Sequence, residues 1–361
     1  MRTTPAMTDS TTTDNPVYFA VPGDLSNLTG GYGYDRELIK GLSQLGIPVE
    51  LLSLSAEFPA PGTAALAETA RIFANLPDGA LVIIDGLAFG VMDTIAQQHS
   101  QRLTLIALCH HPLAFETGIS EAQKKLLQAS ESYALNAAHA IIVTSAATAQ
   151  LLVKYFSVAD EKIVLARPGT HRQEFARSDN QTPQLLTVAT LTKRKGHDVL
   201  IKALAQIKHL SWSARWIGSA AFDPEWATNL TQLIQSTGLE NRIALLGNRD
   251  DLTEEYQSAD AFILPSHFEG YGMAFAEAIS FGLPIIAARA GAVPDLVPPD
   301  AGTLVAPADE NALAVAINEL LTNHNYRQQL QLGAERAALT LPTWEDCAAI
   351  VADTIYHLRN L

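Results

Sequence analysis

The chain has 361 residues, of which 48% are hydrophobic and 17% are charged, so it is long and apolar enough for two globular domains. Its formal net charge is −14, and both halves share the acid excess. Proteins that bind nucleic acid or anionic membranes normally carry a basic patch, so neither partner is expected. No apolar run approaches the roughly 20 residues that span a bilayer, so we expect no transmembrane segment and no peripheral membrane contact. The two cysteines, Cys109 and Cys347, form no metal or disulfide pattern and indicate a reducing cytoplasm.

Residues 1–15 are polar, lack the apolar segment of a signal peptide and are predicted to form a disordered tail. From Val17 onward, short apolar runs alternate with helical periodicity, which is the pattern of an α/β doubly wound sheet. Strands are predicted at residues 17–21, 49–52, 80–84, 103–108, 140–144 and 163–165, with helices that include 34–45, 121–137 and 146–155. A second series of strands is predicted at 185–189, 214–217, 243–246, 261–264, 284–287 and 303–305, with helices at 311–321 and 344–358.

These two series predict two Rossmann-like domains that face a central cleft. The N-terminal domain is expected to span residues 16–170, a polar linker 171–183, and the C-terminal domain 184–343. Ligands of open α/β sheets bind beyond the carboxyl ends of the strands. The loops that follow strands should therefore hold the functional residues.

The loop after the first strand contains Gly30, Gly31 and Gly33 shortly before a helix that is expected to start near Tyr34. Glycines there let the backbone approach a phosphate or a sugar closely, and a helix N-terminus supplies N–H donors. The spacing does not match G-x-G-x-x-G, so a dinucleotide site is poorly supported. A flexible β–α connection is the alternative interpretation.

The fourth strand ends in His110 and His111. A histidine at this edge can donate to a sugar hydroxyl or a phosphate oxygen near neutral pH. The pair is weak as a metal site, because adjacent strand residues point in opposite directions and no third ligand is near in the sequence. We expect at least one of the two histidines in the site, without deciding which, and a structural or surface role is the alternative.

Three consecutive cations, Lys193, Arg194 and Lys195, lie between a strand and a helix that begins near Gly196. The helix dipole disfavours cations at a helix N-terminus. The cluster is explained if an anion binds there, since arginine and lysine hold phosphate oxygens well. A solvated loop is the alternative.

Two carboxylates, Glu269 and Glu277, have seven residues between them in an otherwise apolar segment. Glu269 follows a strand, and Gly272 opens a helix whose second turn holds Glu277. Buried acids need partners, and a helix N-terminus suits a phosphate. A sugar nucleotide would satisfy both, with hydroxyls for the acids and a diphosphate for the helix end. Paired acids also occur in glycoside hydrolases, which do not require the glycines or the cation cluster.

These residues resemble retaining glycosyltransferase family four, a nucleotide-sugar-dependent family with the two-domain GT-B fold. The likeness covers nearly the whole chain. It is carried by the two glutamates and their spacing, and by the matching segments Gly30-Gly31, Thr144-Ser145, Pro168-Gly169, Lys195-Gly196, Gly282-Leu283-Pro284, Gly291 and Ala301-Gly302-Thr303-Leu304-Val305. By the same likeness, the final helix within 344–361 crosses back to the first domain.

The resemblance implies roles for individual residues. Lys195 would hold the diphosphate, Glu277 would accept hydrogen bonds from the ribose hydroxyls, and Glu269 would lie beside the sugar hydroxyls. His110, or His111 in its place, would contact the donor sugar or its leaving phosphate. The implied catalytic residues are His110, Arg194, Lys195 and Glu269, and the implied donor-binding residues are Gly30, Gly31, Gly270, Tyr271, Gly272 and Glu277.

One departure from the family pattern concerns the phosphate site. The family commonly has a Gly-Arg pair where this chain has Ala189-Thr190, and Arg194 is the candidate substitute. No two aspartates are separated by a single residue, so the Asp-x-Asp metal motif of other transferases is absent. Lys195, Arg194 and a helix dipole are therefore expected to replace a metal, and no cofactor is expected.

The leading hypothesis is a cytoplasmic, metal-independent, retaining hexosyltransferase. It would move a sugar from a nucleoside diphosphate sugar, with UDP-glucose and GDP-mannose as first candidates, to a hydroxyl acceptor. The acidic N-terminal half favours a soluble acceptor. Two alternatives stay open: a catalytically weak partner subunit of another glycosyltransferase, which the Thr190 departure allows, and a sugar-nucleotide epimerase of similar fold. The acceptor and the oligomeric state are not defined by the sequence.

Overall fold

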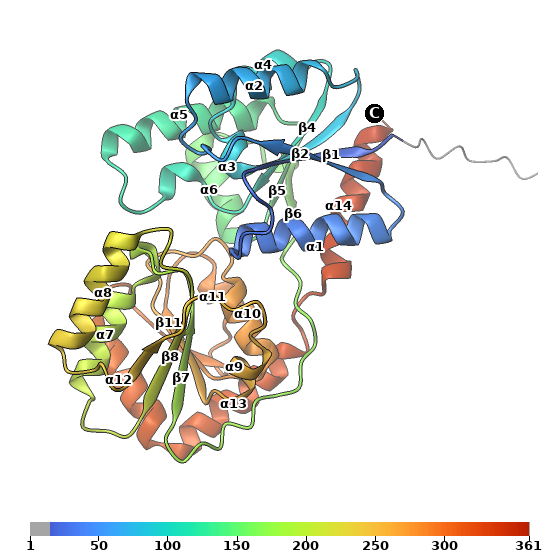
Figure 1. The fold of residues 1–361 in the computed structure, drawn as a ribbon. Helices are drawn as coiled ribbons and strands as arrows, with labels where there is room; N and C mark the ends of the chain where they lie inside the picture. Colours follow the sequence, from blue (N-terminus) through green and yellow to red (C-terminus); the bar gives the residue numbers. More distant parts are fainter. Residues whose placement is uncertain (1–14, 361) are drawn as a thin grey trace, which may run out of the picture.

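The computed structural model describes residues 15–360. The predicted tail of residues 1–15 lies, apart from Asn15, outside these residues. Two α/β domains lie one above the other, and the C-terminal helix runs beside the first helix of the chain (Figure 1). The predicted architecture of two doubly wound sheets is confirmed.

The N-terminal sheet has six parallel strands in the order β2-β1-β3-β4-β5-β6. Its strands are β1 (Val17–Pro22), β2 (Val49–Leu54), β3 (Leu81–Asp85), β4 (Thr104–Cys109), β5 (Ala140–Val143) and β6 (Ile163–Leu165). Its helices are α1 (Gly30–Gln44), α2 (Thr63–Ala74), α3 (Gly86–Phe89), α4 (Asp93–His99), α5 (Glu121–Ala137) and α6 (Ala146–Phe156), with short 3-10 turns η1 (Leu113–Phe115) and η2 (Asp160–Lys162).

The C-terminal sheet also has six parallel strands, in the order β12-β11-β10-β7-β8-β9. Its strands are β7 (Gln184–Val188), β8 (Ser213–Ile217), β9 (Ile243–Leu245), β10 (Ala261–Leu264), β11 (Ile285–Ala288) and β12 (Gly302–Val305). The remaining elements are η3 (Lys193–Lys195), α7 (His197–Gln206), α8 (Pro224–Ser236), α9 (Thr253–Gln257), α10 (Met273–Ser280), α11 (Val293–Leu296), α12 (Glu310–Thr322), α13 (His324–Ala338) and α14 (Trp344–Arg359).

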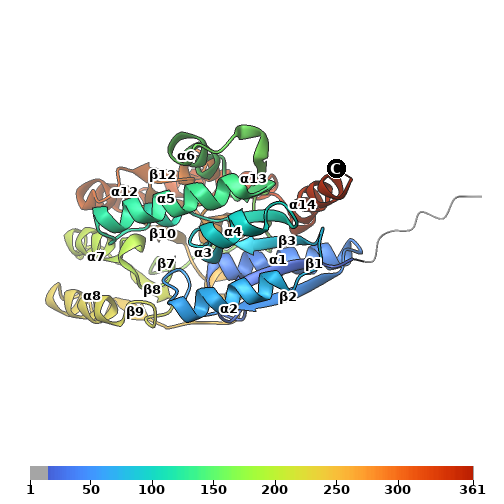
Figure 2. The same cartoon turned by 90° about the horizontal axis from the view of Figure 1, so that it is seen from above.

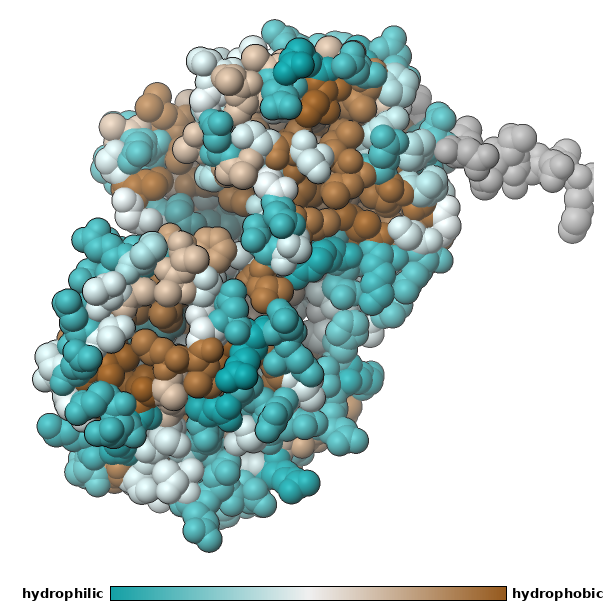
Figure 3. Space-filling view, viewed as in Figure 1, coloured by the Kyte–Doolittle hydropathy of each residue, from teal (hydrophilic) through white to brown (hydrophobic). Residues whose placement is uncertain are grey.

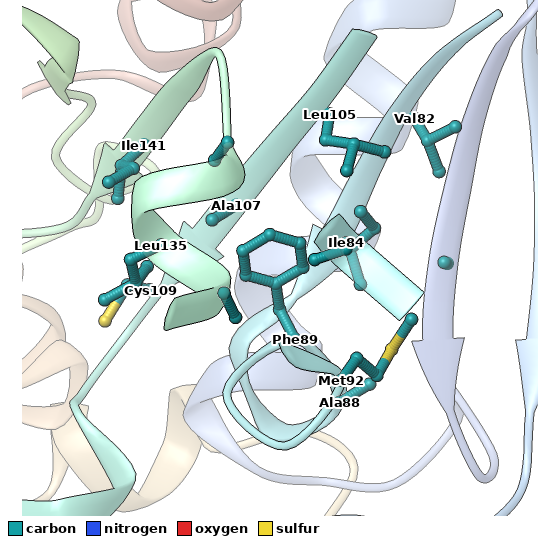
Figure 4. Close-up of a cluster of buried hydrophobic side chains, with 14 of the residues drawn as sticks. Val82, Ile84, Ala88, Phe89, Met92, Leu105, Ala107, Cys109, Leu135 and Ile141 are labelled. Atoms are coloured by element: carbon teal, nitrogen blue, oxygen red, sulfur yellow. The ribbon is translucent and has the colours of Figure 1, made fainter. Parts of the chain in front are cut away.

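Helices cover both faces of the N-terminal sheet, which explains why its strands are continuous apolar runs. In β3, Val82 and Ile84 enter a core shared with α2 to α6, whereas Leu81 and Ile83 enter a core shared with α1 and α14. Phe89 from α3 lies in the middle of the first core (Figure 4). Both faces are therefore filled, and only the strand ends are left for a ligand.

Helix α14 completes the N-terminal domain, although it is last in the sequence. Cys347 and Val351 of α14 belong to the same core as Tyr34 of α1. The Tyr34 hydroxyl donates to Ala166 O at 3.1 Å and lies 3.2 Å from Cys347 Sγ. The two helices pack against each other (Figure 1), and Figure 2 shows the same domain from above. The chain thus passes between the domains twice.

Helix α1 begins one turn earlier than the sequence predicts. The expected start near Tyr34 is wrong: the helix begins at Gly30, so the glycines form its first turn. Thr29 is the N-cap, and its side chain accepts a hydrogen bond from Tyr32 N at 3.4 Å. Glycine weakens a helix on average, but the threonine cap and the packing of Tyr34 and Leu38 in the core outweigh that cost here.

The strand order of the two sheets determines where the cleft lies. In the first sheet β1 lies between β2 and β3, and in the second β7 lies between β8 and β10, so each sheet has a topological switch point. Ligands of such sheets bind beyond the carboxyl ends of the strands at the switch point. The loops after β1, β3, β4, β7 and β10 meet there. In the described part of the chain, no helix is long and apolar enough to cross a membrane.

Candidate active site

A cleft of about 810 Å³ lies between the two domains. The recess between the two lobes is visible in the space-filling view (Figure 3). The structure brings all ten predicted site residues to its walls: Gly30, Gly31, His110, Arg194, Lys195, Glu269, Gly270, Tyr271, Gly272 and Glu277. Their roles stay predictions, but they share one space.

Glu269 is held in the loop after β10, where only 5% of its surface is exposed. Its Oε1 accepts hydrogen bonds from Ser266 Oγ at 2.6 Å and from Lys195 Nζ at 2.7 Å. Its Oε2 lies 3.6 Å from Arg194 Nη1. Burial raises the pKa of Glu269, but Lys195 and Arg194 outweigh burial, and the net pKa lies below the usual value. The carboxyl group is therefore ionised and lies between two cations.

The two cations that contact Glu269 come from η3, directly after β7. Arg194 also donates from Nη1 to Phe268 O at 3.0 Å, and its Nε lies 3.3 Å from Glu116 Oε1 of the other domain. Burial lowers the pKa of Lys195, and the charge of Glu269 offsets only part of that effect. Lys193, by contrast, lies over the ring of Trp226. Two of the three predicted cations thus form a compact group at the cleft.

Glu277 lies in the second turn of α10, as predicted. The helix is N-capped by Gly272, whose φ of 98° favours glycine. The hydroxyl of Tyr256 donates to Glu277 Oε2 at 2.9 Å. Burial raises the pKa of Glu277, and this hydrogen bond lowers it. Glu277 thus faces the cleft with one oxygen already bound to the protein.

The loop that contains Gly270 is also where the domains touch. A Cβ atom at Gly270 would lie 2.1 Å from His110 O, so the two backbones approach too closely for a side chain. Thr148 Oγ1 of the N-terminal domain lies 3.4 Å from Gly270 O. The neighbouring Tyr271 is buried, and its hydroxyl has no hydrogen-bond partner among the described residues.

His110, at the end of β4, is held by two buried acids. Its Nε2 lies 3.1 Å from Asp35 Oδ1 and 3.5 Å from Asp85 Oδ2. Burial lowers the pKa of His110, but the hydrogen bonds and charges of Asp35 and Asp85 outweigh burial and raise it to about 10. Burial and the charge of Asp85 raise the pKa of Asp35 to about 6. His110 is thus a cation at neutral pH.

His111 has a different environment, although it also lines the cleft. Its ring lies 4.5 Å from the Phe268 ring of the other domain, centroid to centroid. Burial lowers its pKa to about 4, so the ring is neutral at pH 7. Of the two histidines, His110 carries the charge and His111 packs against the facing domain.

The N-termini of α1 and α10 come together across the domain boundary. Gly30 and Gly33 lie next to the Met273 side chain, and Gly31 lies beside the His110 ring. Free N–H groups and the positive ends of two helix dipoles therefore face the same space. This arrangement suits an anion with more than one phosphate.

Four residues that support these groups were not predicted from the sequence. Ser266 and Tyr256 hydrogen-bond to the two glutamates, and Asp35 and Asp85 hold His110. Asp85 is the last residue of β3, so the rule that strand ends carry function could have found it. Asp35 lies inside a helix and has no comparable signal.

Asp35, Asp85 and His110 also form a set of possible metal ligands, with ligand atoms within 4.8 Å of one another. Metals bind neutral histidine. The raised pKa of His110 keeps both ring nitrogens protonated at pH 7. A metal ion at this set would have to displace the proton of His110 that Asp35 and Asp85 hold.

Thr190 is the residue that departs from the expected phosphate pair, and it lines the cleft together with Arg194. Arg194 lies in η3, four residues after Thr190, and its side chain contacts Glu269 and Glu116. The role of Arg194 as the substitute for the missing arginine stays a prediction.

Comparisons with known proteins identify relatives of this chain. Residues 170–336 match the family model described as glycosyl transferases group 1. The chain is 25% identical over 317 residues to the MMP alpha-(1->4)-mannosyltransferase of Mycolicibacterium hassiacum, which covers 83% of this chain and 75% of that protein. It is 28% identical over 257 residues to the D-inositol 3-phosphate glycosyltransferase of Xylanimonas cellulosilytica, covering 65% of this chain and 60% of the relative. The match thus spans less than two thirds of the second relative.

Solved structures show the same fold over nearly the whole chain. A sucrose-phosphate synthase from Thermosynechococcus elongatus superposes with a TM-score of 0.82 at 21% identity, covering 95% of this chain and 99% of that one. The Anabaena protein HepE in complex with UDP and glucose superposes with a TM-score of 0.76 at 20% identity, with the same shares covered. Residues 170–336 therefore match the model of the glycosyl transferases of group 1, and the chain as a whole has the GT-B fold.

Proposed function

We propose that this protein transfers a hexose from a nucleoside diphosphate sugar to a hydroxyl acceptor, with retention of the anomeric configuration and without a metal ion. The observation that carries the proposal is the group formed by Glu269, Lys195 and Arg194 beside two helix N-termini, opposite a cationic histidine. The solved structure of HepE holds UDP and glucose, which supports a sugar nucleotide as the ligand of this cleft.

The donor would lie along the C-terminal wall of the cleft. Glu277, with one carboxylate oxygen bound by Tyr256, would accept hydrogen bonds from the ribose. Lys195, Arg194 and the N-terminus of α10 would hold the diphosphate, because each supplies N–H donors or positive charge. Glu269 and His110 would then lie next to the sugar.

The costly event is the build-up of negative charge on the departing diphosphate, together with positive charge at the anomeric carbon. Preorganised donors aimed at the developing charge stabilise such a state. Lys195 and Arg194 are fixed by Glu269, so they need little reorganisation. His110 is protonated at neutral pH and therefore acts as a hydrogen-bond donor, not as a base.

Retention follows if the acceptor attacks from the side of the leaving group. The bond from the anomeric carbon to the phosphate oxygen breaks while the bond to the acceptor oxygen forms on the same face. The acceptor proton passes to the departing phosphate oxygen. Such a step needs no nucleophilic carboxylate, and Glu269, which is held by two cations and Ser266, is poorly suited to be one.

The acceptor would enter from the N-terminal wall, lined by Tyr32, Asp85 and Leu87. Its one cation besides histidine among the described lining residues is Arg36, which donates to Leu25 O and Asn27 O and so fixes the loop after β1. Neutral hydroxyls that hydrogen-bond to a carboxylate fit this wall. We therefore propose a soluble polyol or sugar as the acceptor.

The test is transfer and donor hydrolysis by the purified chain with UDP-glucose and GDP-mannose, in the presence of EDTA. Lys195→Ala and Glu277→Ala should abolish turnover, whereas Lys202→Ala, on the outer face of α7, should not. NMR of the product should show a retained anomeric configuration. Turnover that matches the parent in both site variants would overturn the assignment, and donor binding without turnover would favour the partner-subunit alternative.

A further inference from the structure

Glu277 is partly buried, and its carboxyl group has a single side-chain hydrogen-bond partner among the described residues. Its Oε2 accepts a hydrogen bond from the Tyr256 hydroxyl at 2.9 Å, and Oε1 has no side-chain partner among the described residues. Burial raises the pKa of this carboxyl, and the hydrogen bond from the Tyr256 hydroxyl lowers it. Glu269, by contrast, has two cations and a serine.

Tyr256 is fixed by several contacts besides its hydrogen bond to Glu277. It is 2% exposed, and its ring stacks on Phe281 with centroids 5.0 Å apart and planes at 11°. Its N–H donates to Leu252 O at 3.0 Å. The next residue back, Glu255, is bound by Arg215 Nη2 at 2.6 Å, which fixes α9 to β8. The hydroxyl is therefore presented from a rigid platform.

We infer that Tyr256 is a positioning residue for the nucleotide: its hydroxyl fixes Glu277 so that Oε1 faces the ribose hydroxyls. The inference rests on the proposed function, since it assigns Glu277 a ribose. Two oxygens of one carboxylate cannot rotate independently, so the bond to Oε2 sets the direction of Oε1. A preorganised acceptor binds a pair of hydroxyls with less loss of side-chain entropy than a mobile one.

The same bond favours the ionised form of the carboxyl group, because it lowers the pKa that burial raises. A carboxylate accepts more hydrogen bonds than a carboxylic acid and makes stronger ones. Without the Tyr256 hydroxyl, burial alone acts on Glu277, and its pKa rises further. A higher pKa means that more of the carboxyl group is protonated at acidic pH. Loss of the hydroxyl should therefore weaken nucleotide binding more at acidic pH than at alkaline pH.

The test compares Tyr256→Phe with the parent, using UDP and GDP as probes in calorimetric titrations. The ring and its stacking stay, and only the hydroxyl is removed. We expect about a tenfold weaker Kd for the nucleotide that the parent binds, the effect of losing a hydrogen bond to a charged group. In turnover, KM should rise by the same factor while kcat stays within about twofold, and the defect should grow as pH falls from 7.5 to 5.5.

Three controls separate positioning from a general structural role. Inorganic pyrophosphate, which has no ribose, should bind the variant and the parent equally. Tyr326→Phe, which removes another C-terminal-domain hydroxyl bonded to Thr303 outside the cleft, should leave all constants unchanged. In a double-mutant cycle, Tyr256→Phe combined with Glu277→Gln should weaken binding no further than Glu277→Gln alone.

The outcomes are distinguishable. If the parent binds a nucleotide and Tyr256→Phe binds it equally well, the inference is wrong and the proposed function stands. Equal losses for nucleotide and pyrophosphate, or additive effects in the cycle, also overturn the inference, since the tyrosine would then act on the whole site. If the parent binds neither UDP nor GDP, the proposed function and the inference both fail.

Discussion

The two walls of the cleft bury charge in opposite ways. The C-terminal wall holds one acid, Glu269, between two cations, whereas the N-terminal wall holds one cation, His110, between two acids. The group around Glu269 therefore has an excess of positive charge, and the group around His110 has an excess of negative charge. The C-terminal wall suits a diphosphate, and the N-terminal wall suits neutral hydroxyls that donate to carboxylates. The contrast suggests that donor and acceptor are sorted by charge as well as by shape.

The largest effect should come from removing Glu269, the acid that lies between the two cations of the C-terminal wall. Glu269→Ala leaves Lys195 and Arg194 without their shared partner in a buried site, and we expect a loss of about 3 kcal/mol in the free energy of unfolding. Asp85→Ala leaves His110 with Asp35 as a partner and should cost about 1 to 2 kcal/mol, including the lost N-cap of α3.

Chemical denaturation of both variants measures this difference, with the exposed Glu240→Ala as a control that should match the parent. Equal losses for Glu269→Ala and Asp85→Ala would break the comparison between the walls. Such a result would mean that Asp35 and Asp85, the two acids that hold His110, act as one unit that fails when either is removed.

The next effect concerns catalysis on the N-terminal wall. His110→Gln keeps a hydrogen-bonding side chain but removes the positive charge near the departing phosphate. We expect kcat to fall by about 100-fold, the scale of losing one preorganised donor, with a small change in KM. His209→Gln, on an exposed turn, is the matched control. A parent rate that is flat from pH 6.5 to 8.5 would support His110 as a permanent cation, whereas a sharp rise near pH 6.5 would assign it as a base.

Much of the fold could be predicted because each strand is an apolar run of ordinary length. The start of α1 could not, since three glycines argue against a helix until the Thr29 cap and the tertiary packing of Tyr34 are known. The site residues that follow strands were predicted because ligands of such sheets bind beyond the carboxyl ends of the strands, and the same rule could have found Asp85. Asp35 and Tyr256 lie inside helices, and only the folded chain shows that they face the site. A sequence pattern does not show which charged residues far apart in the chain contact each other.

The walls should also differ in how pH affects stability. The folded pKa of His110 is raised to about 10, from an unfolded value of about 6.5. Its contribution is fully present below pH 6.5 and is lost as pH rises toward 10. The pKa of Glu269 is lowered, so its contribution is present above the unfolded value and is lost as the pH falls through the lower, folded pKa.

Unfolding free energies measured at pH 6.5 and 9 test this asymmetry. The parent should lose stability over this interval, and His110→Gln should lose less, because glutamine does not titrate. Glu269 should contribute no slope in that interval. A slope that is the same in His110→Gln and in the parent would show that other groups carry it, and the raised pKa of His110 would then have no bearing on stability.

The smallest effect should come from the contact that joins the walls. Arg194 Nε lies 3.3 Å from Glu116 Oε1, and the two side chains are 24% and 44% exposed, so solvent screens the pair. Exposed ion pairs of this kind contribute about 0.2 to 1 kcal/mol. Glu116→Gln should therefore change KM by no more than about threefold, and 0.5 M salt should give the parent the same KM as the variant. A much lower KM in Glu116→Gln than in the parent would show a different relation between the two walls. It would show that the N-terminal wall holds Arg194 away from the diphosphate, so that the cation assigned to the donor is shared between the walls until the donor binds.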